Sequence, residues 1–468
     1  DRRQRQMCIR DRYKNKGLIH EYFAKDTTDY NSENVVAVLK NSDNTVQDIT
    51  EDSMVLLKNQ NNTLPLKGDN LKVNLFGYAA TNDGFLLSGG GSGGTSAHRD
   101  NKVTIYDAFE REGIAYNKQL LKAYTDYISY DMDIWDSDVC LINPGREFYT
   151  DELVNQAKEY SDIAVVVLNR YGEENPTPDS EEEIPYTYQL KKTPSGNVKD
   201  TERHTLETST EEDYMIDVVC ENFETVIVLY NAGNIMELGF VEREEIDAAM
   251  FIGMPGQSGA LSAVRLLKGK KTVEDAEGNK SEVQISPSGK LSDTYAYDFT
   301  KYVPSFVNAT SRGTGNLLYA ESVYIGYKWY ETAYAEGYFD SITTEYGKGY
   351  DGVVQYPFGY GLSYTDFTWE VEEGIDPSVA VTDDSEFSVK VRVTNTGEHA
   401  GKDVVQLYYT PPYYEGEIEK SEINLLAFAK TELLQPGQSQ LLELNFTSYD
   451  MASYDCYDKN TNGFMGYE

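Results

Sequence analysis

Two adjacent acidic residues follow a strongly apolar run in the middle of the sequence. The run DIAVVVLN (Asp162–Asn169) leads into RYGEE, which ends in Glu173 and Glu174. A carboxyl group just after the carboxyl end of a buried strand stands where open α/β sheets place ligand sites. Such a group can act as a general acid if burial or neighbouring negative charge raises its pKa. The alternative interpretation is that both are solvated loop acids in a very acidic chain.

A glycine-rich stretch, SGGGSGG (Ser88–Gly94), is the second candidate for chemistry. Glycines allow positive φ angles and a close approach of the backbone to a ligand. A phosphate-binding loop would continue with Lys and Ser or Thr, but Thr95–Ala97 follows instead. The stretch therefore lacks the phosphate-loop pattern, and its polar candidates are Ser92, in the loop, and His98 and Arg99 beside it. A flexible linker is the alternative interpretation.

Apolar runs and helical stretches alternate around these loops and must position them. Near-continuous apolar strands that alternate with helices indicate a parallel sheet covered on both faces. We also expect a helix over Ser32–Lys58, and Gly233–Glu242 can start another. The alternating strands and helices are expected at Asp162–Asn169, Thr210–Asn222, Thr225–Tyr230, Ile246–Gly253 and Gln257–Leu267.

After Asp383 the hydrophobic period changes to two. FSVKVRVTNTG (Phe387–Gly397) alternates apolar and polar residues, and short runs with Gly, Pro and Asn turns follow at 402–412, 423–430 and 434–446. This pattern is typical of an antiparallel β-sandwich.

The composition excludes several classes of protein. The chain has 468 residues, with 78 Asp+Glu against 41 Lys+Arg and a formal charge of -37, which argues against nucleic acid and anionic membranes as partners. No apolar run approaches the ~18 residues of a membrane span. The four cysteines have no metal-site spacing and are expected to be isolated thiols in a reducing compartment. We expect no metal or other cofactor. A cytoplasmic location is expected, and membrane anchoring or secretion stays open if an N-terminal segment is missing.

Seven segments, in order, resemble glycoside hydrolase family 3. One of them is SMVLLKNQNNTLPL. Two others are SPSGKLSDTY, which looks like the family's NPSGKLPDTF, and YPFGYGLSYTDF, which looks like the family's FPFGYGLSYTTF. One such segment would be weak evidence, whereas seven in the same order are specific. The segments are Ser53–Leu66, Ser161–Glu174, Phe223–Phe240, Ser286–Tyr295, Tyr319–Thr332, Gln355–Phe367 and Val393–Tyr409.

The resemblance implies an α/β fold, an (α/β)6 sandwich, followed by an all-β fibronectin type III-like sandwich. We expect residues 1–31 to be an artefactual or disordered start and 32–300 to be the (α/β)6 domain. A tyrosine-rich extension with the PFGYGLSY connector is expected at 301–382, and an incomplete fibronectin type III-like domain at 383–468. Family members also carry a (β/α)8 barrel with a nucleophilic Asp in an S-D-W motif, which does not occur here. We expect the barrel beyond Glu468, as in a reversed-order gut and rumen bacterial subset, or otherwise before residue 1.

The resemblance also implies an activity. The chain looks like part of a retaining, exo-acting β-glycosidase of the β-glucosidase type, which alone would be inactive because the barrel supplies the nucleophile. The family's acid/base residue often lies in a "GE" loop, which corresponds to Glu173, with Glu174 the near alternative. Glu181, Glu182 and Glu183 remain open.

Candidate sugar contacts under this resemblance are Ser92, Arg99, Tyr171 and Asp179. Trp329 and Tyr330 could stack on a sugar face or belong to the core. The expected partners are an oligosaccharide or β-glycoside and the missing barrel, and a homo-oligomer stays open. The alternative function is a non-catalytic carbohydrate-binding or scaffold protein of the same fold.

Overall fold

The computed structural model describes residues 33–89, 102–127, 140–170, 188–193, 195–275, 278–303, 321–459, 463 and 465–467. The chain divides into two units, residues 1–45 and 46–468, each taken by itself. In the first unit, the described residues form the first turns of helix α2 (Glu33–Ser53), where the Val36, Val38 and Leu39 side chains are exposed. The second unit holds the sheets.

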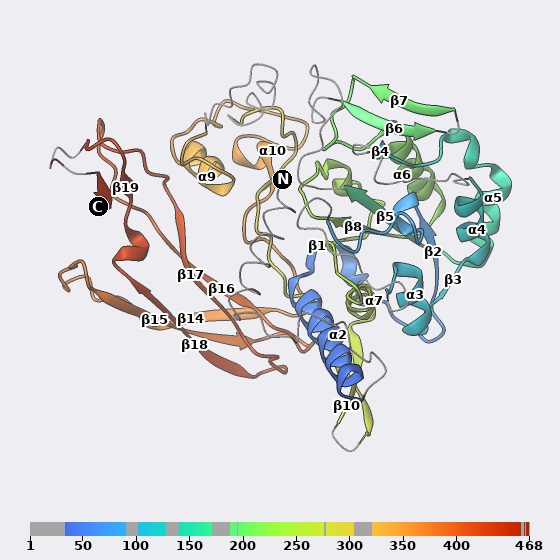
Figure 1. Cartoon of the computed structure of the whole chain (residues 1–468), viewed down its shortest axis with the longest axis horizontal. Helices are drawn as coiled ribbons and strands as arrows, with labels where there is room; N and C mark the ends of the chain where they lie inside the picture. Colours follow the sequence, from blue (N-terminus) through green and yellow to red (C-terminus); the bar gives the residue numbers. More distant parts are fainter. Residues whose placement is uncertain are drawn as a thin grey trace, which may run out of the picture. The chain divides into compact units, whose positions relative to one another are not determined.

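A six-stranded sheet in the order β1-β9-β8-β5-β2-β3 organises the α/β part of the second unit (Figure 1). β9, β8, β5, β2 and β3 run parallel, and β1 is antiparallel to β9. The strands are β1 (Val55–Asn59), β2 (Lys72–Phe76), β3 (Ala115–Tyr116), β5 (Ile163–Arg170), β8 (Thr225–Ala232) and β9 (Ala248–Phe251).

Both faces of this sheet are buried, which explains its near-continuous apolar strands. In β5, Ala164, Val166 and Leu168 belong to one core cluster, and Val165 and Val167 belong to the other. Buried side chains of three helices join the first cluster, and those of two helices join the second. The predicted doubly covered α/β sheet is therefore confirmed. The helices of the first cluster are α4 (Lys118–Tyr127), α5 (Asp151–Tyr160) and α6 (Thr210–Asn222), and those of the second are α3 (Ile105–Arg111) and α7 (Ala260–Lys268).

Two helix predictions were wrong in their extent. The helix expected over Ser32–Lys58 ends at Ser53, and the apolar residues that follow form β1. Val55 of β1 packs into one core cluster and Leu56 into the other, so this run is buried on both sides as a strand. Within Gly233–Glu242, the structure has only the short 3-10 helix η6 (Gly239–Glu242), after an irregular segment.

Short elements complete the α/β part and the segment that leads out of it. Four of them pair as two antiparallel hairpins, β6 with β7 and β10 with β11. The remaining elements up to residue 356 are η2 (Gln60–Asn62), η3 (Tyr78–Ala80), β4 (Cys140–Leu141), η5 (Arg146–Phe148), β6 (Gln189–Thr193), β7 (Gly196–Asp200), β10 (Lys270–Glu274), β11 (Lys280–Gln284), β12 (Tyr295–Ala296), α9 (Tyr327–Ala335), α10 (Tyr350–Val353) and β13 (Val354–Tyr356).

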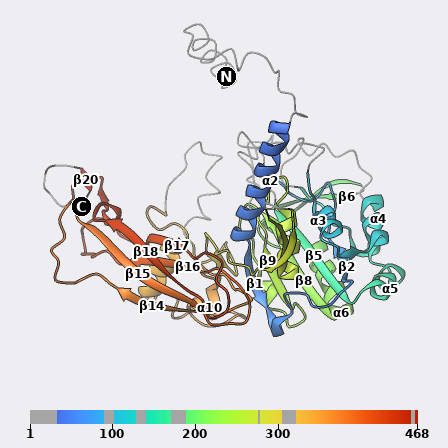
Figure 2. The ribbon, with the colours of Figure 1, turned by 90° about the horizontal axis from the view of Figure 1, so that it is seen from below.

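The C-terminal strands form the predicted β-sandwich (Figure 2). In β15, Val389, Val391 and Val393 are buried at every second position, as the period-two pattern predicts. Leu444 and Phe446 of β18 join the same core. One sheet has the order β14-β15-β18 and the other pairs β16 with β17. The elements are β14 (Phe367–Glu373), β15 (Glu386–Asn395), β16 (Val404–Tyr409), β17 (Asn424–Lys430), β18 (Ser439–Thr447), η8 (Tyr449–Met451), β19 (Tyr454–Asp455) and β20 (Gly466–Tyr467).

The connector Pro357–Tyr364 is fastened to the α/β part by tyrosine hydroxyls. The Tyr360 hydroxyl donates to the Leu57 carbonyl (3.0 Å), and the Tyr364 hydroxyl donates to the Leu266 carbonyl (2.8 Å). Because both acceptors are main-chain atoms of the α/β part, the connector follows a fixed path just before β14 begins.

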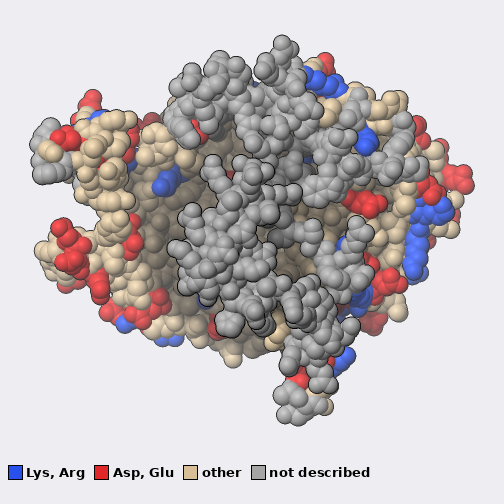
Figure 3. Space-filling view, viewed as in Figure 1, with Lys and Arg blue, Asp and Glu red and all other residues tan. Residues whose placement is uncertain are grey.

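The described surface fits the acidic composition. Figure 3 shows Asp and Glu side chains spread widely over the described surface of one face. Within the described ranges, no helix combines the length and the apolar character that crossing a membrane requires.

Buried tyrosines predict an alkaline loss of stability. Burial raises the pKa of Tyr106, Tyr124, Tyr149 and Tyr230 above the ordinary value. Because an unfolded tyrosine ionises near about 10, the unfolded state binds fewer protons above that pH, and stability falls as pH rises. We expect the urea midpoint of unfolding to drop steeply between about pH 10 and 12. Absorbance at 295 nm, which reports ionised tyrosine, should rise over the same pH range.

Tyr106→Phe is the matched variant for this prediction. The Tyr106 side chain is buried, and its hydroxyl has no hydrogen-bond partner in the described part of the chain. Its removal should leave stability at pH 7 unchanged or higher and should flatten the alkaline decline. Smooth titration of all tyrosines near pH 10 in a chain that keeps its circular dichroism would contradict the prediction.

Candidate functional site

The carboxyl ends of β2, β5 and β8 lie side by side because these strands are parallel neighbours. The Asn231 side chain, fully buried at the end of β8, accepts from the Leu86 N–H (2.7 Å) and donates to the carbonyls of Leu86 (2.9 Å) and Gly253 (2.7 Å). The Asn169 side chain, near the end of β5, donates to the Gly84 carbonyl (2.6 Å). The segment that enters the glycine-rich stretch is thus fastened to both strand ends.

The last residue of β5, Arg170, forms a buried ion pair with Glu212 of α6. Both side chains are 1% exposed, and the two Nη–Oε distances are 2.9 and 2.7 Å. Arg170 also donates to the carbonyls of Thr205 (2.8 Å), Asn169 (2.7 Å) and Glu207. Burial alone would lower the pKa of Arg170, but the Glu212 carboxylate outweighs it and raises that pKa. Arg170 is therefore a permanent cation that holds the end of β5.

Like Arg170, Gln189 is fixed by buried hydrogen bonds to the turn 201–209, and it follows residues 171–187 in the sequence. Its side chain is fully buried, and its Nε2 donates to the carbonyls of His204 (2.9 Å), Glu207 (3.2 Å) and Thr208 (3.3 Å). The same turn, residues 201–209, accepts hydrogen bonds from Arg170. One turn therefore fixes the chain on both sides of the stretch that contains the predicted acid/base residues.

The residues predicted to do chemistry lie outside the described residues. Of the two predicted aromatic stacking residues, Tyr330 is buried in a core cluster with Phe339, as its core interpretation predicts. Trp329 is partly buried and donates from its indole nitrogen to the Tyr302 carbonyl (2.6 Å). The predicted residues outside the described part are Ser92, His98, Arg99, Tyr171, Glu173, Glu174, Asp179, Glu181, Glu182 and Glu183.

Sequence reasoning missed Arg170, Gln189 and Asn231 as residues that hold this edge. One signal was present, because an Arg that ends an apolar strand must find a partner if it is buried. The matching carboxylate was also visible, since Ser209 and Glu212 form a capping box at the start of α6. Their pairing spans 42 residues and could not be read from local pattern.

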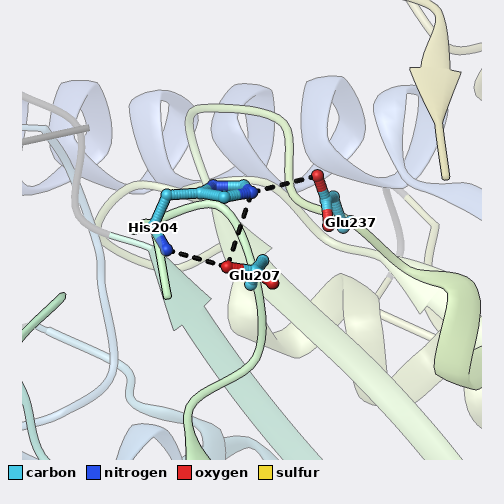
Figure 4. Close-up of side chains that lie close together, drawn as sticks. All are labelled: His204, Glu207 and Glu237. Atoms are coloured by element: carbon cyan, nitrogen blue, oxygen red, sulfur yellow. Dashed lines mark hydrogen bonds and ion pairs between the residues drawn. The ribbon is translucent and has the colours of Figure 1, made fainter. Parts of the chain in front are cut away.

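A histidine and two glutamates gather at the same edge of the sheet (Figure 4). His204 Nε2 lies 3.2 Å from Glu237 Oε1 and 3.6 Å from Glu207 Oε2, separations that a tetrahedral metal site would also show. However, His204 Nδ1 accepts a hydrogen bond from the Leu206 N–H (3.3 Å), so the ring carries its proton on Nε2. A metal on Nε2 would move that proton to Nδ1, against another donor. The cluster is therefore a hydrogen-bonded bridge between the turn and the loop after β8.

Comparison with known proteins identifies the fold family. A profile of the "Glycosyl hydrolase family 3 C-terminal domain" matches residues 54–364, which is more than half of the chain. The chain belongs to glycosyl hydrolase family 3. A "Fibronectin type III-like domain" profile matches residues 403–461. The described strands of this family 3 chain form no (β/α)8 barrel, as the sequence predicted.

Among curated relatives of this family 3 chain, a beta-glucosidase of Ruminococcus albus is 32% identical over 90% of this chain and 38% of the relative. Beta-glucosidase A of Butyrivibrio fibrisolvens is 30% identical over 91% of this chain and 48% of the relative. A solved beta-glucosidase from Paenibacillus barengoltzii superposes with a TM-score of 0.68 and 31% identity, over 89% of this chain and 39% of that chain. The family 3 chain thus spans less than half the length of each of these proteins.

Proposed function

We propose that this chain is the acid/base-bearing part of a retaining, exo-acting β-glycosidase of the β-glucosidase type. It would remove terminal β-linked sugars from the non-reducing end. The nucleophile would come from a (β/α)8 barrel outside residues 1–468. The family match over residues 54–364 carries the proposal, and the beta-glucosidase names of the relatives support it.

The chemistry assigns one step to each of two carboxyl groups. As the bond between sugar C1 and the glycosidic oxygen breaks, the nucleophile bonds to C1 and the general acid gives its proton to the leaving oxygen. The same residue then takes a proton from the water that attacks C1, which frees the nucleophile. We propose Glu173 for this role and Glu174 as the near alternative. Arg170 precedes Glu173 by three residues, so a fixed Arg170 limits where that carboxyl can reach.

Sugar contacts in the proposal come from Ser92, Arg99, Tyr171 and Asp179. The hydrogen bonds of Asn231 and Asn169 support the first two, since they fasten the segment that leads into the glycine-rich stretch. Tyr171 directly follows Arg170 in the sequence.

The test compares two proteins in the same assay. The 468-residue chain and the complete reading frame are each assayed on aryl β-glucoside and aryl β-xyloside. We expect turnover by the complete frame with retention at C1, and none by the chain alone. Turnover by the chain alone would overturn the division of the site. A complete frame that encodes no barrel and binds sugars without turnover would support the alternative, a non-catalytic carbohydrate-binding or scaffold protein.

A further inference from the structure

A cavity of ≈ 640 Å³ lies where the carboxyl ends of β8 and β9 meet β16 and β17. Its walls include Asn234 just after β8, Asp293 from the segment before β12, and Phe428 of β17. The volume falls in the range of about 300–1,000 Å³ that is usual for small-molecule sites. All of its walls belong to the unit of residues 46–468.

The two lysines that line the cavity already have partners. Lys430 Nζ donates to the carbonyls of Asp52 (2.6 Å) and Ser288 (3.1 Å). Lys290 Nζ lies 3.2 Å from an Asp403 carboxylate oxygen and donates to the Gly361 carbonyl (2.8 Å). These two lysines therefore link the β-sandwich to the α/β part and the connector. Their hydrogen bonds and ion pair already use the charges that an anionic ligand would need.

Two other groups at the cavity offer acceptors that the described residues leave unused. Asp293 accepts one backbone hydrogen bond, from Thr294 (2.8 Å), and no ion pair joins it to a cation of the described residues. Burial raises the pKa of Asp293. The side-chain oxygen of Asn234 is buried without any partner among the described residues. A ligand that donates hydrogen bonds would satisfy both.

The charge and the aromatic surface of the cavity narrow the class of ligand that it can bind. The cavity is lined by two acids, Asp52 and Asp293, and two lysines, so its formal charge is zero within a chain of -37. Phe428, which is 69% exposed, and Phe358 add aromatic surface. Phe358 is held by Tyr327, with ring centroids 4.4 Å apart. Rings beside hydrogen-bond acceptors suit a neutral ligand with an apolar face and several hydroxyl groups.

We propose that this cavity binds a neutral sugar of one or two rings. The Asp293 carboxyl group and the Asn234 amide oxygen accept from its hydroxyls, and Phe358 and Phe428 cover its C–H faces. The site uses only residues of this chain, so it goes beyond the proposed hydrolysis and does not depend on it. Binding here requires no barrel.

The experiment titrates the purified 468-residue chain with glucose, xylose and cellobiose, by calorimetry and saturation-transfer NMR. We expect saturable binding with a Kd of about 1 mM for at least one sugar. Asp293→Ala, Asn234→Ala and Phe428→Ala should each weaken it about tenfold. Glu331→Gln and Tyr414→Ala are the matched controls. They change another carboxyl group with a burial-raised pKa and another exposed ring, neither of which lines the cavity.

A second measurement, the thermal midpoint of Asp293→Asn, tests whether a variant at this position still folds. Because burial raises the pKa of Asp293, ionisation destabilises the native state, and this cost grows as pH rises above about 4. Asp293→Asn should therefore raise the thermal midpoint at pH 7 and leave it unchanged near pH 4. No saturable binding up to about 100 mM sugar, or equal affinity in cavity and control variants, would overturn the proposal. Tighter binding of butylammonium than of any sugar would overturn the neutral-ligand assignment. None of these outcomes bears on turnover by the complete frame.

Discussion

Glu173→Gln in the complete reading frame is expected to lower kcat about 10²–10⁴-fold on β-glucosides with poor leaving groups. An amide cannot give a proton to the departing oxygen, so the barrier to cleavage of the glycosidic bond rises. With 2,4-dinitrophenol, a leaving group that departs as the anion, the first step should be nearly unaffected. Release of the sugar from the nucleophile should then limit the rate, because no base activates water. A burst of dinitrophenolate followed by slow turnover is the signature to measure.

Glu174→Gln is the matched control for Glu173. The two residues are adjacent and have the same charge, so a general electrostatic effect would act on both variants alike. We expect Glu174→Gln to keep kcat within about tenfold of the parent and to show no burst. If Glu174→Gln shows the burst and Glu173→Gln does not, the assignment moves to Glu174. If neither does, the acid/base residue lies elsewhere, with Glu181, Glu182 and Glu183 as the next candidates.

Glu212→Ala is expected to destabilise the chain by about 3–5 kcal/mol, because it leaves the buried Arg170 cation without its partner. The variant also removes one side of the capping box with Ser209, whose N–H donates to Glu212 Oε2 (2.8 Å). Urea denaturation of the 468-residue chain, followed by circular dichroism, measures the loss. Some of it should appear as local opening, with earlier proteolysis around the turn 201–209 than in the parent.

A double-mutant cycle separates the ion pair from simple loss of packing. Arg170→Met with Glu212→Leu removes both charges, so it should cost less than the sum of the two single changes. The exposed pair Lys390–Glu373 serves as the control, and Glu373→Ala should change stability little. Additive losses in the buried pair, or a Glu212→Ala cost below about 1 kcal/mol, would contradict the role assigned to it.

Much of the fold could be predicted from local pattern. The run after Asp162 is apolar at every position because both faces of β5 are covered, and the pattern after Asp383 alternates because one face of β15 is covered. From the sequence, the apolar residues from Val55 fit a helix as well as a strand, because a short apolar run has no period of its own. Only pairing with β9, almost 200 residues later, makes them a strand.

For the candidate site, the sequence named residues but not the contacts between distant segments. Glu173 and Glu174 could be named from their place after a buried strand and from family resemblance, and they remain predictions. Arg170 could be seen as the end of that strand, but its charge gave no hint of four hydrogen bonds to α6 and the turn 201–209. Such contacts depend on where separate segments meet in space.

The sequence by itself determined the classes of most elements, their order and the family, because hydrophobic period and motif order are properties of neighbouring residues. The tertiary structure decided which segments meet: β1 with β9, Arg170 with Glu212, and Asp293 and Asn234 with Phe428 across one cavity. The physical reason is that burial makes polar groups depend on partners distant in sequence. A buried cation requires its carboxylate, and a buried acceptor without a donor requires an explanation, for which we propose a ligand at this cavity.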